Sequence, residues 1–195
     1  MPFYIGLLHY PVYNKRREII ASAITNLDLH DLARLAKTYG ARRFYVINPL
    51  VDQQALAKRI CEHWVSGYGA RYNSDRQEAM SLISVVSTLE EAVAEIEKTE
   101  GQLPALMVTD ARKNRGERIT YDVAREIVAS HKTIMVLFGT AWGIADELLK
   151  RADYVLAPIL GVSRYNHLSV RGAAAITLDR LFSRVAEPRR GMYFE

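Results

Sequence analysis

The stretch TIMVLFGTAWGIADELLKRADYVLAPILGVSRYNHLSVRGAAAITLDRL, residues 133–181, decides the fold. It contains two apolar runs, at 134–138 and 154–159, and each run is followed by a loop that contains glycine. We interpret the runs as buried strands of a parallel sheet whose loops lie side by side. Loops at the carboxyl ends of such strands form the ligand crevice, and glycine there lets backbone amides approach a bound molecule.

The rest of the chain repeats this alternation of strand and helix. Apolar runs predict further strands at 3–8, 43–47, 80–86 and 105–109. Helical spacing predicts a helix that begins near an Asp28 cap and stops at Gly40, and others at about 53–66, 88–98 and 120–130. Strands that alternate with helices indicate an α/β fold with a mostly parallel sheet flanked by helices. We expect one domain, residues 1–195, because no linker or repeat divides the chain.

Bulk properties narrow the class of protein. The chain has 195 residues, a net charge of +4 and a pI near 9.2, so a polyanionic partner is plausible. The sole cysteine, Cys61, excludes an internal disulfide and fits a reducing compartment. No apolar segment approaches the roughly 20 residues that span a bilayer, and the first residues do not resemble a signal peptide. We therefore expect a cytoplasmic protein without a membrane partner.

Two cationic loops follow predicted strands. In a parallel sheet both loops would reach the same edge and form a cationic rim around one cleft, which favours RNA binding. The alternative is ordinary solvated surface. The predicted rim comprises Lys15, Arg16, Arg17, Arg112, Lys113, Arg115 and Arg118.

Three motifs in the last third of the chain carry a family resemblance. FGTAWG, LAPI and YNHLSVRGAAAI resemble the C-terminal motifs of the SPOUT superfamily, and ITNLDLHDLARLAKTYG agrees with its N-terminal motif. Members of this superfamily are RNA methyltransferases, and the match is closest to a small stand-alone bacterial group among them. The resemblance implies a C-terminal trefoil knot, a homodimer, and S-adenosyl-L-methionine as methyl donor, with S-adenosyl-L-homocysteine as product.

The resemblance also assigns roles to residues. Asn26 and Arg34 match polar positions that the family places near the reacting centre, with Asp31 or Asp110 as a possible proton acceptor. Ser163, Arg164 and Tyr165 would lie near the methyl group or the target nucleotide, with Tyr165 counted among the catalytic candidates and Arg164 among the RNA contacts. The cofactor would be held, mostly by main-chain atoms, around Leu137, Gly139, Thr140, Gly143, Ile159, Asn166, Leu168, Ser169 and Ala173.

Residues at the same loops have simpler interpretations. FGTAWG lacks the GxGxxG spacing and a Walker-type lysine, which disfavours phosphate cradling. Trp142 is more often a packing residue than an adenine platform, and His167 is more often a structural residue at a helix start than a general base. The five histidines show no metal-ligand spacing, so no metal is invoked.

Two other functions stay open beside the methyltransferase. One is a non-catalytic RNA-binding protein on the same knotted scaffold, and the other is a nucleotide-binding α/β domain without an RNA role. Fold class does not specify the modified atom, so transfer RNA and ribosomal RNA, base and ribose, are all possible targets.

Overall fold

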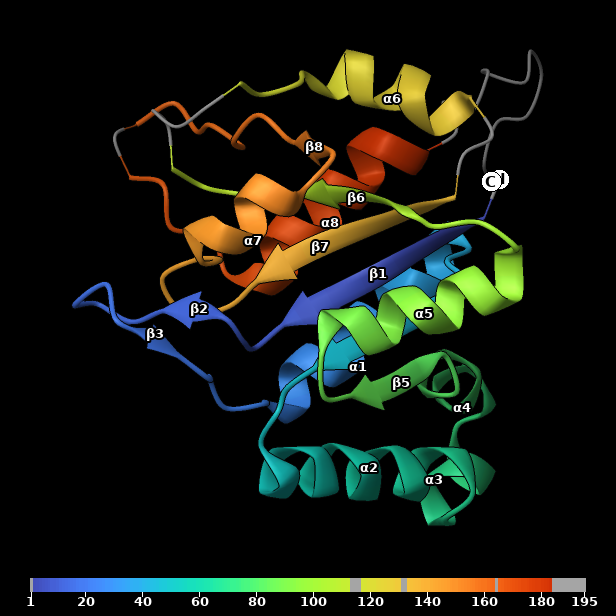
Figure 1. Cartoon of the computed structure of the whole chain (residues 1–195). Coiled ribbons are helices and arrows are strands. Elements are labelled where there is room, and N and C mark those ends of the chain that lie inside the picture. The colour runs from blue at the N-terminus through green and yellow to red at the C-terminus, as the bar shows by residue number, and fades with distance from the viewer. Residues whose placement is uncertain (1, 113–116, 131–132, 164, 184–195) are drawn as a thin grey trace.

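The computed structural model describes residues 2–112, 117–130, 133–163 and 165–183, and a six-stranded sheet lies at its centre (Figure 1). The strands are β1 (Phe3–Leu8), β2 (Val12–Tyr13), β3 (Ile19–Ile20), β4 (Arg43–Ile47), β5 (Ile83–Val86), β6 (Ala105–Val108), β7 (Ile134–Gly139) and β8 (Tyr154–Val155). The strand order is β5-β4-β1-β7-β6-β8, and every pairing in this sheet is parallel. The predicted α/β class with a parallel sheet is confirmed.

Helices cover both faces of the sheet. They are α1 (Asn26–Tyr39), α2 (Val51–Val65), α3 (Tyr68–Tyr72), α4 (Ser74–Met80), α5 (Leu89–Glu100), α6 (Tyr121–Ala129), α7 (Asp146–Arg151) and α8 (Val170–Phe182). Buried residues of α1, α6 and α8 share one core with one face of the sheet, whereas α5 and α7 share a second core with the other face. None of the helices in the described ranges is long and apolar enough to cross a membrane.

The central strand β1 shows why the sheet is buried on both sides. Phe3 and Ile5 belong to the α1 core, whereas Tyr4 and Leu8 belong to the α5 core. This alternation follows from the two-residue period of a strand. A Cβ atom at Gly6 would lie 2.5 Å from a Leu137 methyl carbon, so glycine lets β7 side chains pack across β1.

Several helix boundaries follow from local sequence. Gly40 ends α1 in the left-handed region with φ of 78°, as predicted. Thr88 caps α5 and Thr120 caps α6, each by accepting a backbone N–H in the first turn. The predicted Asp28 cap is wrong, because the hydroxyl of Thr25 accepts the N–H of Asp28 and Asp28 already lies inside α1.

Some strand predictions were also wrong. The run at 80–86 begins with the end of α4, and its strand starts only at Ile83. The run at 154–159 contains only the two-residue strand β8, after which the chain leaves the ladder before Pro158. Strands β7 and β8 are not neighbours, because β6 lies between them. The segment after Pro11, predicted as a loop, forms the antiparallel hairpin β2–β3.

Candidate cofactor pocket

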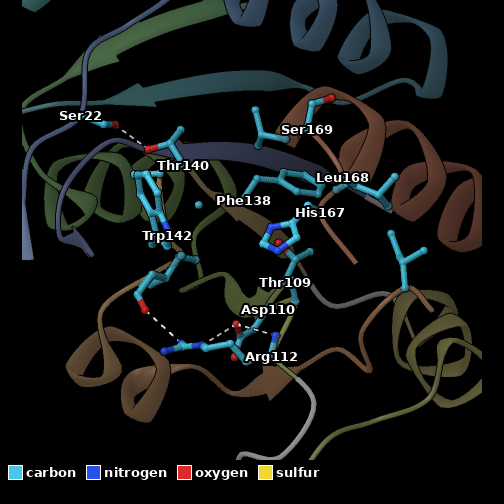
Figure 2. A pocket seen from close by; sticks show the side chains of 18 of the residues that line it. Ser22, Thr109, Asp110, Arg112, Phe138, Thr140, Trp142, His167, Leu168 and Ser169 are labelled. Carbon is cyan, nitrogen blue, oxygen red and sulfur yellow. Dashed lines mark hydrogen bonds and ion pairs between the residues drawn. The ribbon is translucent and has the colours of Figure 1, made fainter. Parts of the chain in front are cut away.

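A pocket of about 790 Å³ lies at the carboxyl ends of β1, β6 and β7 (Figure 2). Its walls are the turn after β7, the loop after β6, the segment before α8 and the start of α1. Its volume lies within the range of about 300–1,000 Å³ usual for small-molecule sites. The two loops of the opening sequence stretch therefore do converge, although the strands that precede them are separated by β6.

The turn after β7 is held in one shape from two sides. Ala141 and Gly143 have positive φ angles of 51° and 97°. The hairpin strand β2 binds the turn through two backbone hydrogen bonds of 2.9 Å, from Tyr13 to the Gly143 carbonyl and from Trp142 to the Tyr13 carbonyl. A Cβ atom at Gly139 would lie 2.4 Å from a side-chain carbon of Ile144. This close packing needs glycine at 139.

The segment before α8 forms the opposite wall. The side-chain amide of Asn166 donates to the Ala111 carbonyl at 3.1 Å, which ties this segment to the loop after β6. Ser169 caps α8 by accepting the N–H of Gly172 at 3.1 Å. Figure 2 shows the His167 ring, which belongs to this segment, near Phe138 of β7 and Thr109 of the loop after β6.

An ion-pair network closes the lower side of the pocket. The Asp110 carboxylate, which is 3% exposed, accepts hydrogen bonds from Arg112 Nε at 2.8 Å and from Arg118 at 3.0 Å. Arg112 also donates to Asp146 at 3.0 Å (Figure 2). Both oxygens of the Asp110 carboxylate are engaged by guanidinium groups, so this network fastens the loop after β6 to its neighbours.

The structure places the predicted cofactor residues as follows. Leu137 is buried in β7 and its side chain belongs to the α5 core, so it does not line the pocket. The others lie on the pocket wall: Gly139, Thr140, Gly143, Ile159, Asn166, Leu168, Ser169 and Ala173. Because this wall combines small side chains with main-chain atoms, its composition fits a nucleoside held by backbone contacts.

The predicted catalytic residues lie elsewhere. Asn26 and Arg34 are exposed on α1, and neither lines the pocket. Asp31 accepts from Arg171 at 3.1 Å, and Tyr165 is 73% exposed outside the pocket wall. From α1 the pocket receives Asp28, which pairs with Arg171 at 3.3 Å.

The predicted RNA contacts divide into four groups. Arg17 and Arg112 line the pocket, and Lys15 and Arg16 are exposed on the hairpin turn. The Arg118 side chain is only 9% exposed and also donates to the Asp110 and Leu156 carbonyls, so it belongs to the interior of the molecule. Lys113, Arg115 and Arg164 lie outside the described residues.

Hydroxyl side chains that the sequence did not single out also line the pocket. Ser22 and Thr25 come from the segment between β3 and α1, Thr109 directly follows β6, and Thr177 lies within α8. No sequence motif marks these residues, and the return of the hairpin to the sheet edge brings Ser22 and Thr25 there. In the described ranges, no group of histidine, cysteine, aspartate or glutamate side chains could hold a metal ion.

Comparison with known proteins identifies the family. Residues 2–183 match the model of a family described as SAM-dependent RNA methyltransferase. The chain belongs to this family. Members depend on S-adenosyl-L-methionine, and the pocket offers this methyltransferase family chain a site of suitable size at the expected sheet edge.

Two relatives differ in the share of their own length that this chain covers. It is 43% identical to a tRNA (guanine-N(1)-)-methyltransferase of Oleidesulfovibrio alaskensis over 91% of its own length but only 41% of that protein. It is 41% identical to an uncharacterized protein of Aquifex aeolicus, with 93% of this chain and 88% of the relative covered. The chain thus spans about two fifths of the first relative.

Solved structures share the fold of this methyltransferase family chain. A methylase family protein from Neisseria gonorrhoeae superimposes with a TM-score of 0.63 at 16% identity, covering 99% of this chain and 87% of the other. The SpoU methyltransferase AviRb from Streptomyces viridochromogenes gives 0.57 at 17% identity, covering 93% and 58%. These likenesses show a shared fold, whereas the trefoil knot stays a prediction.

Proposed function

We propose that this chain is an S-adenosyl-L-methionine-dependent methyltransferase acting on RNA, and that the pocket described above holds its methyl donor. The observation that carries the proposal is the convergence of the Gly139–Gly143 turn and the Asn166–Ser169 segment on one pocket. Family membership supports the same cofactor. The donor would supply an electrophilic methyl group, and the chain would supply binding and alignment.

The pocket residues would act mainly by orientation. Direct methyl transfer requires the target atom, the methyl carbon and the sulfur in line, and fixed positioning supplies much of the rate enhancement. The turn at Gly139 and Gly143 presents backbone atoms in a shape fixed by the hairpin. The loop fastened by Asn166 would hold the donor from the opposite side.

The rim of the pocket suits a nucleotide target. Trp142 is 57% exposed although the turn that carries it is rigidly bonded to β2. An exposed indole of fixed position can stack on a nucleobase. The Arg17 guanidinium lies 4.0 Å above the Tyr13 ring and lines the same pocket, where it can meet a phosphate. We therefore assign target capture to Trp142 and Arg17.

We further propose that the chain acts as a homodimer. Asn26 and Arg34, the predicted catalytic residues, are exposed on α1 and do not reach the pocket of their own protomer. Leu27, Leu160 and Leu168 are apolar side chains exposed at α1 and near the pocket. A second copy seated there would cover these side chains and could bring Asn26 and Arg34 to its partner's pocket.

The identity of the modified nucleotide is not carried over from the relatives. The name tRNA (guanine-N(1)-)-methyltransferase describes a protein of which this chain covers 41%, so that activity can reside in its remaining part. Transfer RNA and ribosomal RNA both remain in the proposal, and cytoplasmic RNA is the expected target pool.

Two measurements test the proposed function. Calorimetry should detect S-adenosyl-L-methionine binding at micromolar concentration, and tritium should pass from labelled donor to total RNA. Arg34→Ala should abolish transfer while donor binding stays unchanged. Exposed Arg125, which pairs with Asp122 and the Arg180 carbonyl on the surface, provides the matched control, Arg125→Ala. Donor binding without transfer to any RNA would favour the non-catalytic RNA-binding protein instead.

A further inference from the structure

A chain of hydrogen bonds runs from a buried histidine to the pocket wall. His9 follows β1, has no exposed surface and does not line the pocket. Its Nδ1 lies 2.9 Å from the Ser22 hydroxyl, which lies 2.6 Å from the Thr140 hydroxyl (Figure 2). The Thr140 hydroxyl in turn lies 3.0 Å from the Leu8 carbonyl. Ser22 and Thr140 both line the pocket.

The direction of every bond in this chain follows from the last one. A carbonyl oxygen can only accept, so Thr140 spends its single hydroxyl hydrogen on Leu8. Ser22 must then donate to Thr140, which is much nearer than its other acceptor, the His9 carbonyl at 3.5 Å. With that hydrogen committed, Ser22 can only accept from His9. On this assignment the His9 ring carries its proton on Nδ1.

The environment of His9 fits this assignment. Burial lowers the pKa of His9 to about 4, so the ring is neutral near pH 7 and holds a single proton. Neutral imidazole is a donor at one nitrogen and an acceptor at the other. With this proton on Nδ1, the Nε2 atom is a buried acceptor without a hydrogen-bond partner among the described residues, and the Ala23 backbone is a second hydrogen-bonding contact of the ring.

The consequence appears at Thr140. Its hydroxyl receives a hydrogen from Ser22 and gives one to Leu8, so it has no hydrogen left for a ligand and offers the pocket only a lone pair. We propose that His9 is a positioning residue that, through Ser22, fixes Thr140 as a hydrogen-bond acceptor for an N–H or O–H group of the methyl donor. This inference rests on the proposed function of the pocket.

Selectivity would follow from the same arrangement. An amine, ammonium or hydroxyl group of the donor can meet the Thr140 lone pair, whereas a carbonyl or carboxylate oxygen there would face another acceptor. A ligand that leaves this buried polar group without its partner should bind about fivefold to a hundredfold more weakly. The chain therefore favours ligands that place a hydrogen-bond donor beside the Ser22–Thr140 pair.

A double-mutant cycle on donor affinity tests the inference. Thr140→Val keeps the shape but removes the acceptor, and His9→Leu removes the Nδ1–H donor. Each should weaken S-adenosyl-L-methionine binding about fivefold, as expected for one hydrogen bond. In the Thr140→Val background, His9→Leu should weaken binding no further, because both changes act on one contact. His9→Asn, whose amide can donate near the Nδ1 position, should restore most of the affinity.

The possible results are distinguishable. Unfolding temperatures measured without ligand report any structural damage separately from affinity. Additive losses in the cycle, or a Thr140→Val variant that binds like wild type, overturn the inference alone. Wild-type protein that binds no S-adenosyl-L-methionine overturns the inference together with the proposed function.

Nuclear magnetic resonance gives a second test that needs no variant to fold. A long-range proton–nitrogen spectrum of the wild-type protein near pH 7 reports which nitrogen of His9 is protonated. The Nδ1–H form is expected. An Nε2–H form would reverse the direction of the chain and overturn the inference.

Discussion

Asn166 donates from its side-chain amide to the backbone carbonyl of Ala111 at 3.1 Å and so joins two loops that lie 55 residues apart in the sequence. The first loop follows β6 and the second precedes α8, and together they form one side of the pocket. This contact joins the segments that follow the neighbouring strands β6 and β8 into one continuous wall. Its removal should therefore affect ligand binding more than folding.

Replacing Asn166 tests that expectation. Asn166→Ala should weaken S-adenosyl-L-methionine binding about fivefold, because one hydrogen bond to a backbone carbonyl is lost. The unfolding temperature without ligand should change little, since Asn166 lies near the surface. Calorimetry and a thermal scan of the same preparation measure both quantities. Equal affinity in wild type and variant would contradict a role for this contact in the pocket wall.

The turn after β7 should not tolerate a side chain at Gly139. Gly139→Ala would place Cβ 2.4 Å from a carbon of Ile144, which forces the turn to move. We expect a loss of about 1–3 kcal/mol in the free energy of unfolding and at least tenfold weaker donor binding. Gly161→Ala is the matched control, because its nearest neighbour would lie 4.0 Å away. Urea unfolding and calorimetry should separate the two variants.

Trp142 should matter for RNA and not for the methyl donor. Trp142→Ala removes an exposed ring on a turn that keeps its backbone hydrogen bonds. Base stacking contributes about 1–3 kcal/mol, so kcat/KM for RNA should fall at least fivefold while donor affinity stays within about twofold. Tyr72→Ala removes a more exposed ring from α3, far from the pocket in the fold, and should leave both unchanged. Tritium transfer kinetics provide the measurement.

Arg118 should stabilise the fold and not bind RNA. The buried Asp110 carboxylate pairs with Arg112 and Arg118, and Arg118→Ala removes the second of these pairs. Breaking such a buried pair costs about 3–5 kcal/mol, whereas the exposed pair lost in Arg125→Ala should cost less than about 1 kcal/mol. Urea unfolding measures the difference. A stable Arg118→Ala protein with weakened RNA binding would instead support the original RNA-contact prediction.

Burial of His9 should make stability depend on pH. Its pKa falls from 6.5 to about 4 in the folded chain, so the unfolded chain binds more protons between these values. Stability from this group is therefore complete above pH 6.5 and is lost as the pH falls toward 4. The free energy of unfolding should drop by about 2 kcal/mol more in wild type than in His9→Asn between about pH 7 and pH 5. Parallel slopes in urea titrations of both proteins would contradict this.

Sequence patterns predicted the elements whose signals are local. The strand Phe3–Leu8 is a continuous apolar run, and the caps at Thr88 and Thr120 are set by residues three positions away. The family motifs placed Gly139 and Ser169 at one site because each motif is contiguous in the chain. The strand predicted at 80–86 began too early, because the buried Met80 is the last residue of helix α4 and not part of a strand.

Side-chain roles in the site depended on contacts between distant segments. Arg118 resembles any loop cation in the sequence, yet Asp110 and the Leu156 carbonyl draw it inside. Ser22 carries no motif and reaches Thr140, 118 residues away, only because the β2–β3 hairpin returns to the sheet edge. Asp31 pairs with Arg171 across the α1–α8 contact.

The sequence by itself determined the parallel α/β class, the family and the segments that form the pocket, because apolar periodicity, caps and contiguous motifs are properties of neighbouring residues. Only the tertiary structure decided that β6 separates β7 from β8, that Arg118 is buried, and that a histidine outside the pocket orients a threonine within it. Burial and hydrogen-bond direction depend on contacts between residues that are distant in the sequence, and these contacts form only in the folded chain.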